Sequence, residues 1–249
     1  MVSVKNRRPA ALCVDERKVN RDMKEYPKIQ SLFKRDTKGK MLFDQYSLPE
    51  FEYLKDCMWR FTEKVNGTNI RIMWRPSGEG CSSPDGLGPS TSLGRTIGGK
   101  TDNAQIPTFL FEQLIHMFPE EKLKEVFGEV PVCLYGEGYG ARIQKGGGNY
   151  IHDGVSFVLF DVLIDGWWLK QEDVADIAQK LSILTVPHIA TGNLSEMVTM
   201  VSRGFDSTWG AFEAEGIVAR PGVGLMSRNG HRIITKLKHA DFKHVIEKT

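Results

Sequence analysis

Two short segments in the first third of the chain alternate bulky and polar residues. Residues 58–64 (MWRFTEK) and 69–75 (NIRIMWR) show this pattern, which is typical of β-strands. The connection Val65-Asn66-Gly67-Thr68 is too short for anything but a tight turn, in which Gly67 can take a positive φ. We therefore expect a β-hairpin with Lys64 at its mouth.

The apolar pattern predicts further elements downstream. We expect helices at 108–117, 119–128, 171–182 and 193–203, and strands at 131–136, 155–163, 215–220 and 231–238, followed by a short helix. Strands and helices are mixed without regular βαβ alternation. This arrangement indicates an α+β fold with antiparallel sheets.

Three segments lack periodicity. Residues 1–25 are polar and charge-mixed and predict a loosely held arm, and residues 76–92, rich in Gly, Ser and Pro, predict a surface loop. The segment 141–154 contains three consecutive glycines, which imply a sharply bent backbone or a close approach to a ligand. We expect an arm (1–25) and one domain (26–249), with no separate C-terminal domain.

Composition narrows the functional classes. The chain is 41% hydrophobic with a formal net charge of +2, so any nucleic-acid binding requires locally concentrated basic residues. The four cysteines show no zinc-site spacing and predict reduced thiols in a cytoplasmic protein: Cys13, Cys57, Cys81 and Cys133. The first residues lack the apolar core of a signal peptide, and no apolar run is long enough for a membrane span. We expect no membrane partner.

Lys64 is the first candidate for chemistry. It ends an apolar strand beside a glycine turn. A protonated lysine is a poor nucleophile, and burial or nearby cations would favour the neutral amine. Taken alone, Lys64 is better interpreted as an ordinary surface lysine at the end of a hairpin, because a single short motif is weak evidence.

Six short segments change this picture when they are considered together. They occur in the order TEKVNGTN (62–69), LGRT (93–96), LYGEGYG (134–140), FVLFDV (157–162), EGIVAR (215–220) and ITKLK (234–238). Their order, separations and strand contexts resemble the motifs of the covalent ligase and capping-enzyme superfamily, from about residue 27 to 240. The resemblance implies a nucleotidyltransferase (ATP-grasp-like) domain of two antiparallel β-sheets with flanking helices, with ATP bound between the sheets.

Within that superfamily the chain resembles the RNA ligase 2-like family. DNA ligases and capping enzymes usually carry Lys-x-Asp-Gly-x-Arg, whereas this chain reads Lys-Val-Asn-Gly-Thr-Asn at 64–69. The segments 142–146 (RIQKG) and 27–36 (PKIQSLFKRD) are also similar to that family. Asn66 departs from the more widespread aspartate and leaves one carboxylate fewer beside the lysine.

The resemblance implies a role for three lysines. Lys64 would attack the α-phosphorus of ATP and carry AMP as a phosphoramidate. Lys236 and Lys238 alternate on one strand and so face the same side. In the family, this pair contacts the α-phosphate, where positive charge stabilises the transition state. Two surface lysines on an edge strand are the simpler alternative.

The resemblance also implies carboxylates and an aromatic side chain for the nucleotide. Glu137 and Glu215 would hold the ribose hydroxyls and a divalent cation, Mg²⁺ or Mn²⁺. Phe160 matches the aromatic residue that stacks on adenine. Phe157 points to the other face of a regular strand. The pattern alone leaves both phenylalanines open.

Three further residues receive roles from the resemblance. Glu63 would contact the adenine edge, Arg95 would grip a phosphate and the RNA, and Asn69 would contact the RNA end. An amide can bond a 2′-OH, the group that distinguishes RNA from DNA. Other cations are candidates for a wider phosphate-binding surface: Arg71, Arg75, Lys100, Arg142 and Lys145.

These roles imply an ATP-dependent RNA ligase that joins 5′-phosphate and 3′-OH ends through lysyl-AMP and RNA-adenylate intermediates. Its expected partners are ATP and RNA ends, single-stranded or in a nicked duplex, and a monomeric, phage-like enzyme is expected. Only eleven residues follow Lys238, so we expect no duplex-binding C-terminal domain. The alternatives are a DNA ligase or capping-type enzyme, and a non-catalytic module that binds nucleic-acid ends.

Overall fold

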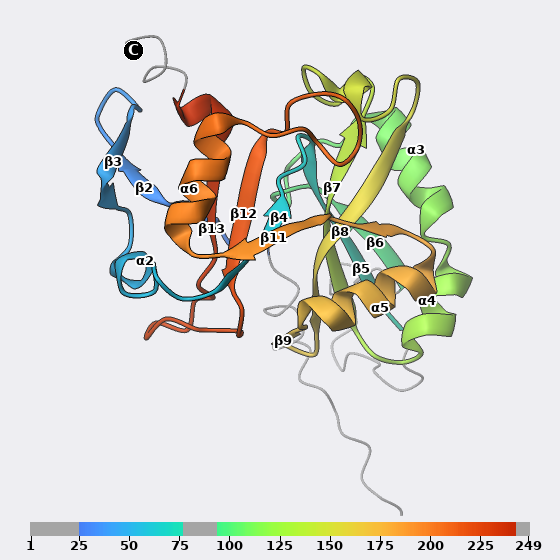
Figure 1. The fold of residues 1–249 in the computed structure, drawn as a ribbon. Helices are drawn as coiled ribbons and strands as arrows, with labels where there is room; N and C mark the ends of the chain where they lie inside the picture. The colour runs from blue at the N-terminus through green and yellow to red at the C-terminus, as the bar shows by residue number, and fades with distance from the viewer. Residues whose placement is uncertain (1–24, 77–93, 243–249) are drawn as a thin grey trace, which may run out of the picture.

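The computed structural model describes residues 25–76 and 94–242. It contains two β-sheets that face each other, with helices on their outer sides (Figure 1). The expected N-terminal arm, apart from Glu25, and the expected loop at 76–92, apart from Pro76, lie outside the described residues. Within the described residues, no helix is both long and apolar enough to cross a membrane.

The first sheet has five strands in the order β1, β13, β12, β4, β11. These are Gln30–Ser31, Thr235–Lys238, Gly216–Pro221, Trp59–Glu63 and His188–Gly192. All neighbours are antiparallel except β1 and β13, which are parallel. Helices α2 (Pro49–Tyr53) and α6 (Leu194–Arg203) accompany this sheet, and α6 begins with a capping box between Asn193 and Glu196.

The second sheet has six strands. The order is β10 (Leu184–Thr185), β8 (Val155–Ile164), β7 (Val132–Gly140), β5 (Thr68–Arg75) and β6 (Gly94–Gly98), and β9 (Trp167–Trp168) pairs with β8. Only the β10–β8 pair is parallel. Helices α3 (Thr108–Met117), α4 (Glu120–Phe127) and α5 (Gln171–Leu181) cover its outer face (Figure 1).

Smaller elements complete the fold. Strands β2 (Phe33–Arg35) and β3 (Met41–Tyr46) form a two-stranded hairpin at the edge of the five-stranded sheet. Two 3₁₀ helices, η1 (Gly147–Asn149) and η2 (His239–Phe242), follow β7 and β13. The turn at η1 confirms the sharp bend expected from the three glycines. A Cβ on Gly147 would lie 2.0 Å from the carbonyl oxygen of Gly140.

The expected hairpin around Lys64 is wrong. Strand β4 belongs to the five-stranded sheet and β5 to the six-stranded sheet, so the connection at 64–67 passes from one sheet to the other. Gly67 is needed for close packing rather than for a positive φ, because a Cβ there would lie 2.3 Å from the carbonyl oxygen of Gly138. Both segments are strands, as their alternation predicted, but each pairs within a different sheet.

The remaining expectations agree with the structure in part. The α+β class and the antiparallel sheets are confirmed, and the four predicted helices end within one residue of the observed bounds. The strand expected at 231–238 forms only at Thr235–Lys238, and the expected last helix appears as η2. Of the cysteines, Cys57 and Cys133 are free thiols, and the other two lie outside the described residues.

Candidate active site

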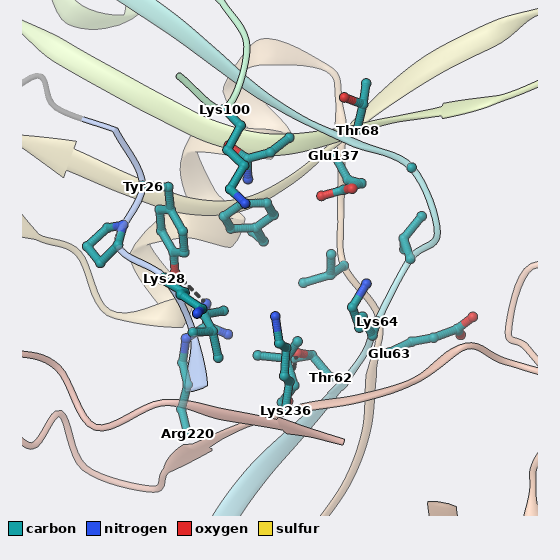
Figure 2. Close-up of a pocket in the computed structure, with 18 residues that line it drawn as sticks. Tyr26, Lys28, Thr62, Glu63, Lys64, Thr68, Lys100, Glu137, Arg220 and Lys236 are labelled. Carbon is teal, nitrogen blue, oxygen red and sulfur yellow. Dashed lines mark hydrogen bonds between the residues drawn. The ribbon is translucent and has the colours of Figure 1, made fainter. Parts of the chain in front are cut away.

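A cavity of about 360 Å³ lies between the two sheets (Figure 2). Its size suits a small-molecule ligand. Side chains from both sheets and from the segment before β1 line it. Its polar lining residues are Tyr26, Lys28, Thr62, Glu63, Lys64, Thr68, Asn69, Lys100, Glu137, Arg220 and Lys236.

Strand pairing in the five-stranded sheet brings the candidate lysines of β13 close to Lys64 at the end of β4. Thr62 on β4 pairs with Val218 on β12, which pairs with Lys236 on β13. Two residues further along each strand, the amide of Lys64 donates to the carbonyl of Gly216 at 2.9 Å, and Gly216 pairs with Lys238. The register therefore brings together three lysines that are up to 174 positions apart in the sequence.

Glu215 joins two of these lysines. Its Oε2 lies 2.6 Å from Lys64 Nζ and its Oε1 lies 2.7 Å from Lys238 Nζ. The carboxylate is 16% exposed and Lys64 is 19% exposed, so this pair is largely desolvated, whereas Lys238 is 40% exposed. One carboxylate thus holds the predicted nucleophile and one of the predicted phosphate lysines.

Glu137 faces this group from the six-stranded sheet, where it pairs with Asn69 across β7 and β5. Burial raises the pKa of Glu137 to about 7, Lys64 opposes the shift, and Glu215 adds to it. Asn69 Oδ1 is buried and accepts no hydrogen bond among the described residues. The site therefore contains a buried acceptor, Asn69 Oδ1, without a partner among the described residues, and a carboxylate, Glu137, whose pKa depends on the neighbouring charges.

Glu137 lines the cavity and Glu215 pairs with the cavity residue Lys64, and carboxylates are suitable donors for Mg²⁺ or Mn²⁺. Among the described residues, no cluster of three or more His, Cys, Asp or Glu side chains could hold a metal alone. Mg²⁺ commonly binds through one or two carboxylates plus substrate phosphates and water. Glu137 and Glu215 fit that pattern, with a nucleotide completing the coordination.

Lys236 lies within a strongly positive part of the cavity. Burial lowers the pKa of Lys236, and the charges of Lys64, Lys238 and Lys100 lower it further, while Glu215 opposes them. These neighbouring cations make an anion the natural occupant. A polyphosphate would relieve their mutual repulsion.

Arg71 positions Lys100 rather than contacting a ligand. It is 2% exposed, and its guanidinium donates to the carbonyl of Gly99 and to Asp102 Oδ1, both at 2.8 Å. These bonds fix the loop after β6 that directs Lys100 into the cavity (Figure 2). The expectation that Arg71 belongs to the exposed phosphate surface is therefore wrong.

The structure separates the two candidate phenylalanines. Phe160 lines the cavity. Phe157 is fully buried beneath α3, where it makes an edge contact with Phe118 at 5.2 Å between ring centroids. Only Phe160 is within reach of a ligand in the cavity.

Near Phe160, four polar side chains connect the two sheets. Asp161 Oδ2 accepts hydrogen bonds from Tyr26 at 2.7 Å, Arg220 at 3.2 Å and Arg232 at 2.8 Å. Asp161 is fully buried. Burial and the Asp161 charge raise the pKa of Tyr26 to about 12. We call Tyr26, Asp161, Arg220 and Arg232 the ionic bridge.

The side chain of Glu63 points away from the cavity (Figure 2). Its carboxylate accepts hydrogen bonds from the Ser207 hydroxyl and from the amide and hydroxyl of Thr208, at 2.9 and 2.8 Å. Glu63 is 1% exposed. The carboxylate thus holds the loop before β12, while Glu63 as a residue also lines the cavity. Its contact with the adenine edge stays a prediction.

That loop brings aromatic rings across to the six-stranded sheet. Trp209 contacts Tyr139 and Tyr150 at 4.9 and 6.1 Å between ring centroids, and Phe212 contacts Tyr150 at 4.9 Å. We call Tyr139, Tyr150, Trp209 and Phe212 the aromatic bridge. It lies at the Lys64 end of the strands, opposite the end that carries the ionic bridge.

Asn66 is tied to the glycine-rich segment. Its side-chain Nδ2 donates to the carbonyl of Lys145 at 3.2 Å. The hydroxyl of Tyr150 accepts from the Asn66 main-chain N–H at 3.1 Å. Arg142 and Lys145 are exposed on this segment, so both remain candidates for an outer phosphate-binding surface.

Arg95 does not reach the cavity. Its Nη1 donates to the carbonyls of Ile115 and Phe118 at 2.9 and 2.6 Å, at the C-terminal end of α3. A cation in this position stabilises the helix end. The expected phosphate contact of Arg95 is therefore wrong, and Lys100, five positions later, supplies a cation to the cavity instead.

Sequence reasoning missed several lining residues. Tyr26 and Lys28 precede the first strand, and Arg220 sits at the end of a recognised segment. The alternation on β12 could have identified Arg220, since it shares a face with Val218. Nothing in the local sequence around Tyr26 indicates that it packs between the sheets.

Comparison with known proteins places this geometry in a family. The sequence profile of the RNA ligase family matches residues 58–238, most of the chain. A search of curated proteins found no match.

The fold is similar to solved structures of an RNA ligase from Naegleria gruberi. A mutant with ATP and Mn has a TM-score of 0.56 at 15% identity, with 91% of this chain and 60% of that chain covered. The enzyme with PPi gives 0.56 at 14% identity, covering 91% and 61%. A mutant with AMP and Mn gives 0.54 at 14% identity, covering 91% and 60%. The chain thus spans about 60% of the length of these ligases, and at this identity they show a shared fold. On the profile match, the chain belongs to the RNA ligase family.

Proposed function

We propose that the protein is an ATP-dependent RNA ligase with Lys64 as its nucleophile. The observation that carries the proposal is the arrangement around Lys64 Nζ. It lies in a nucleotide-sized cavity, 2.6 Å from Glu215, with Lys236 and Lys238 on the next strand but one. Solved relatives of the same fold were obtained with ATP, AMP and PPi.

The reaction has three balanced steps. The neutral Lys64 amine forms a bond to the α-phosphorus of ATP, pyrophosphate leaves, and the amine proton passes to solvent. An RNA 5′-phosphate oxygen then attacks the lysyl-bound phosphorus, the P–N bond breaks, and Lys64 recovers its proton. Finally the 3′-OH of a second end attacks the 5′-phosphorus, AMP leaves, and the hydroxyl proton is lost.

The cations of the cavity would bind the phosphates. Lys236 and Lys238 stabilise negative charge on the α-phosphate as the nucleophile attacks, because both lie on the strand that faces Lys64 across β12. Lys28 and Lys100 line the same cavity and are suited to hold the leaving pyrophosphate. In this assignment Lys100 takes the phosphate role expected of Arg95.

The base and sugar would lie between the sheets. Phe160 lines the cavity from the six-stranded sheet and Val218 from the five-stranded sheet, so adenine fits between an aromatic ring and an apolar side chain. Glu137 is placed for the ribose hydroxyls. Asn69, whose buried Oδ1 has no partner among the described residues, is suited to accept from the 2′-OH of the RNA end.

Glu137 and Glu215 would hold the divalent cation. When bound, Mg²⁺ or Mn²⁺ supplies positive charge to the phosphates and orients them. Glu215 also keeps Lys64 and Lys238 in position through its two ion pairs.

Incubation with α-labelled ATP and Mg²⁺, followed by a denaturing gel, tests the proposal. Wild-type protein should retain label, and Lys64→Ala should retain none. Lys122→Ala, which removes a partly exposed lysine on α4 far from the cavity lining, is the matched control and should label as the wild type does. Absence of label from folded protein stripped of bound AMP, at every pH and with either metal, would contradict the proposal and favour a module that only binds RNA ends.

A further inference from the structure

The β2–β3 hairpin carries an unusual concentration of positive charge. Residues 34–40 (KRDTKGK) contain four cations and one acid, a net charge of +3, whereas the whole chain of 249 residues carries +2. On the adjoining strand, 41–46, Asp44 is the single acid. Outside the hairpin, the chain is therefore nearly neutral, and the charge is concentrated on this projection.

Three of the cations have no internal partner. Lys34, Lys38 and Lys40 are exposed, and in the part of the chain that the structure describes their side chains form no ion pair or hydrogen bond. Asp36 does not neutralise them through side-chain contacts, because its Oδ1 accepts from the main-chain amides of Lys38 and Lys40, both at 2.8 Å. The acid shapes the turn, and the lysines remain available.

The hairpin is anchored rather than loosely attached. Phe33 contacts Phe43 and Tyr46 at 5.6 and 5.3 Å between ring centroids, and Phe43 stacks on Phe242 of η2 at 4.5 Å. One face is thus packed against the core and the other presents lysines. A preorganised surface loses little conformational entropy when it binds a ligand.

Strand directions bring the hairpin turn to the same end of the sheet as the nucleophile. Strand β4 ends at Lys64, β12 is antiparallel to β4, and β13 is antiparallel to β12, so β13 ends at Lys238 on that same side. Strand β1 is parallel to β13 and leads directly into β2. Figure 1 shows the turn between β2 and β3 at the end of the molecule where β13 passes into η2.

A chain of contacts links the hairpin to the nucleophile. Arg35 Nη2 lies 2.6 Å from Asp241 Oδ1, and Asp241 Oδ2 accepts from the main-chain amide of Lys238 at 3.2 Å. Lys238 in turn shares Glu215 with Lys64. Arg35 therefore holds the hairpin beside the candidate active site, and the three free lysines extend the positive surface outward from it.

We propose that the β2–β3 hairpin is a docking surface for the sugar-phosphate backbone of the RNA, with Lys34, Lys38 and Lys40 contacting phosphates away from the reacting end. The proposal rests on the proposed function, which supplies the polyanionic substrate. Lys34 follows Ser31, the partner of Lys236, by three residues, so their Cα atoms are at most about 10 Å apart. That separation corresponds to about three 3.4 Å nucleotide steps of one strand in a duplex.

The salt dependence of RNA binding tests the proposal. Affinity for a nicked RNA duplex is measured at several salt concentrations for the wild type and for K34A/K38A/K40A. The matched control is K122A/K124A/K180A, which removes the same charge from α4 and α5 on the outside of the six-stranded sheet. Each lost phosphate contact should reduce the slope of log K against log salt by about 0.9, so the hairpin variant should lose about 2 to 3.

At about 0.1 M salt, this change corresponds to an affinity loss on the order of a hundredfold for the hairpin variant, with little change for the control. Labelling by ATP should be the same in all three proteins, because none of these residues lies in the cavity. Equal losses in both variants would show that only overall charge matters, and no loss in the hairpin variant would show that the hairpin serves no RNA contact; either result overturns the proposal. Failure of Lys64 labelling in the wild type would instead contradict the proposed function, and the binding comparison would still be interpretable.

Discussion

The two sheets are connected by side chains at both ends of their strands, and the two connections differ in chemistry. The ionic bridge relies on one buried carboxylate that accepts from a phenol and two guanidiniums. The aromatic bridge relies on ring contacts at 4.9 to 6.1 Å between centroids. Hydrogen bonds between charged groups fix direction and distance, whereas ring contacts tolerate small displacements. The site is therefore held rigidly at one end and more adaptably at the Lys64 end.

The largest effect is expected from removing the ionic bridge. Asp161→Ala would leave two largely buried guanidiniums without their counter-charge and should lower the free energy of unfolding by about 3–5 kcal/mol. Urea denaturation followed by tryptophan fluorescence measures it. Tyr26→Phe, which removes a single hydroxyl from the same network, should cost only about 1–3 kcal/mol. A cost for Asp161→Ala no larger than that of Tyr26→Phe would contradict the central role of the carboxylate.

Truncation within the aromatic bridge should cost less. Trp209 is partly exposed, so Trp209→Ala should lower the free energy of unfolding by about 2–3 kcal/mol, below the usual range for a fully buried ring. Trp209→Phe should recover most of this loss because ring contacts are not strongly directional. Chemical denaturation of both variants provides the measurement, and equal destabilisation by Ala and Phe would mean that a specific indole contact matters.

Glu63 anchors the loop that carries Trp209 and Phe212 of the aromatic bridge, and its substitution tests this anchor. Glu63→Gln keeps the shape but removes the charge from three accepted hydrogen bonds, and it should cost about 1.5–3 kcal/mol of stability. The KM for ATP in the labelling reaction should change little, because the side chain points away from the cavity. A KM that rises strongly while stability is unchanged would support the adenine-contact role implied by the resemblance.

A further effect at the Lys64 end is a pH dependence of stability that comes from Glu137. Because burial raises the pKa of Glu137 from 4.5 to about 7, the folded protein holds this proton more tightly than the unfolded chain does. Its stabilising contribution is therefore fully present below about pH 4.5 and is lost as the pH rises through 7.

Unfolding free energies measured in metal-free buffer between pH 5 and 8 should show this slope, and Glu137→Gln should remove it. Tyr26→Phe should leave the slope unchanged, because the raised pKa of Tyr26 lies near 12. An identical slope in wild type and Glu137→Gln would assign the titration to another group.

Local patterns predicted the elements better than their partners. The helices at α3 to α6 follow from the apolar period, since each needs only one sheet face to pack against. The hairpin around Lys64 was predicted wrongly because alternation specifies which residues of a strand share a face, but not which strand lies beside it. The prediction that Arg95 contacts a phosphate in the cavity disagrees with the structure for a related reason. A guanidinium serves a helix end or a phosphate equally well, and only the tertiary packing of α3 decides between them.

The candidate site follows the same division. Lys64, Glu137, Glu215 and the lysines of β13 were predicted because they lie within recognisable strings, and the structure brings them together. Tyr26 and Lys28 enter the cavity from a segment whose path depends on long-range contacts. Lys100 was one of five candidate phosphate cations, and the bonds from Arg71 to the loop after β6 direct it into the cavity. The sequence contains these contacts but gives no local signal for them.

The crossing at 64–67 has a mechanical consequence. Strands β5 to β10 all belong to the six-stranded sheet, so the chain leaves the five-stranded sheet after Lys64 and returns to it before His188. These two connections are adjacent, since the amide of Glu63 donates to the carbonyl of Pro187 at 2.9 Å. A rotation of one sheet against the other would therefore have its hinge at these two connections, next to Lys64. Displacements grow with distance from such a hinge, so the nucleophile would stay nearly still. The ionic bridge joins the sheets away from this hinge and would limit how far they separate.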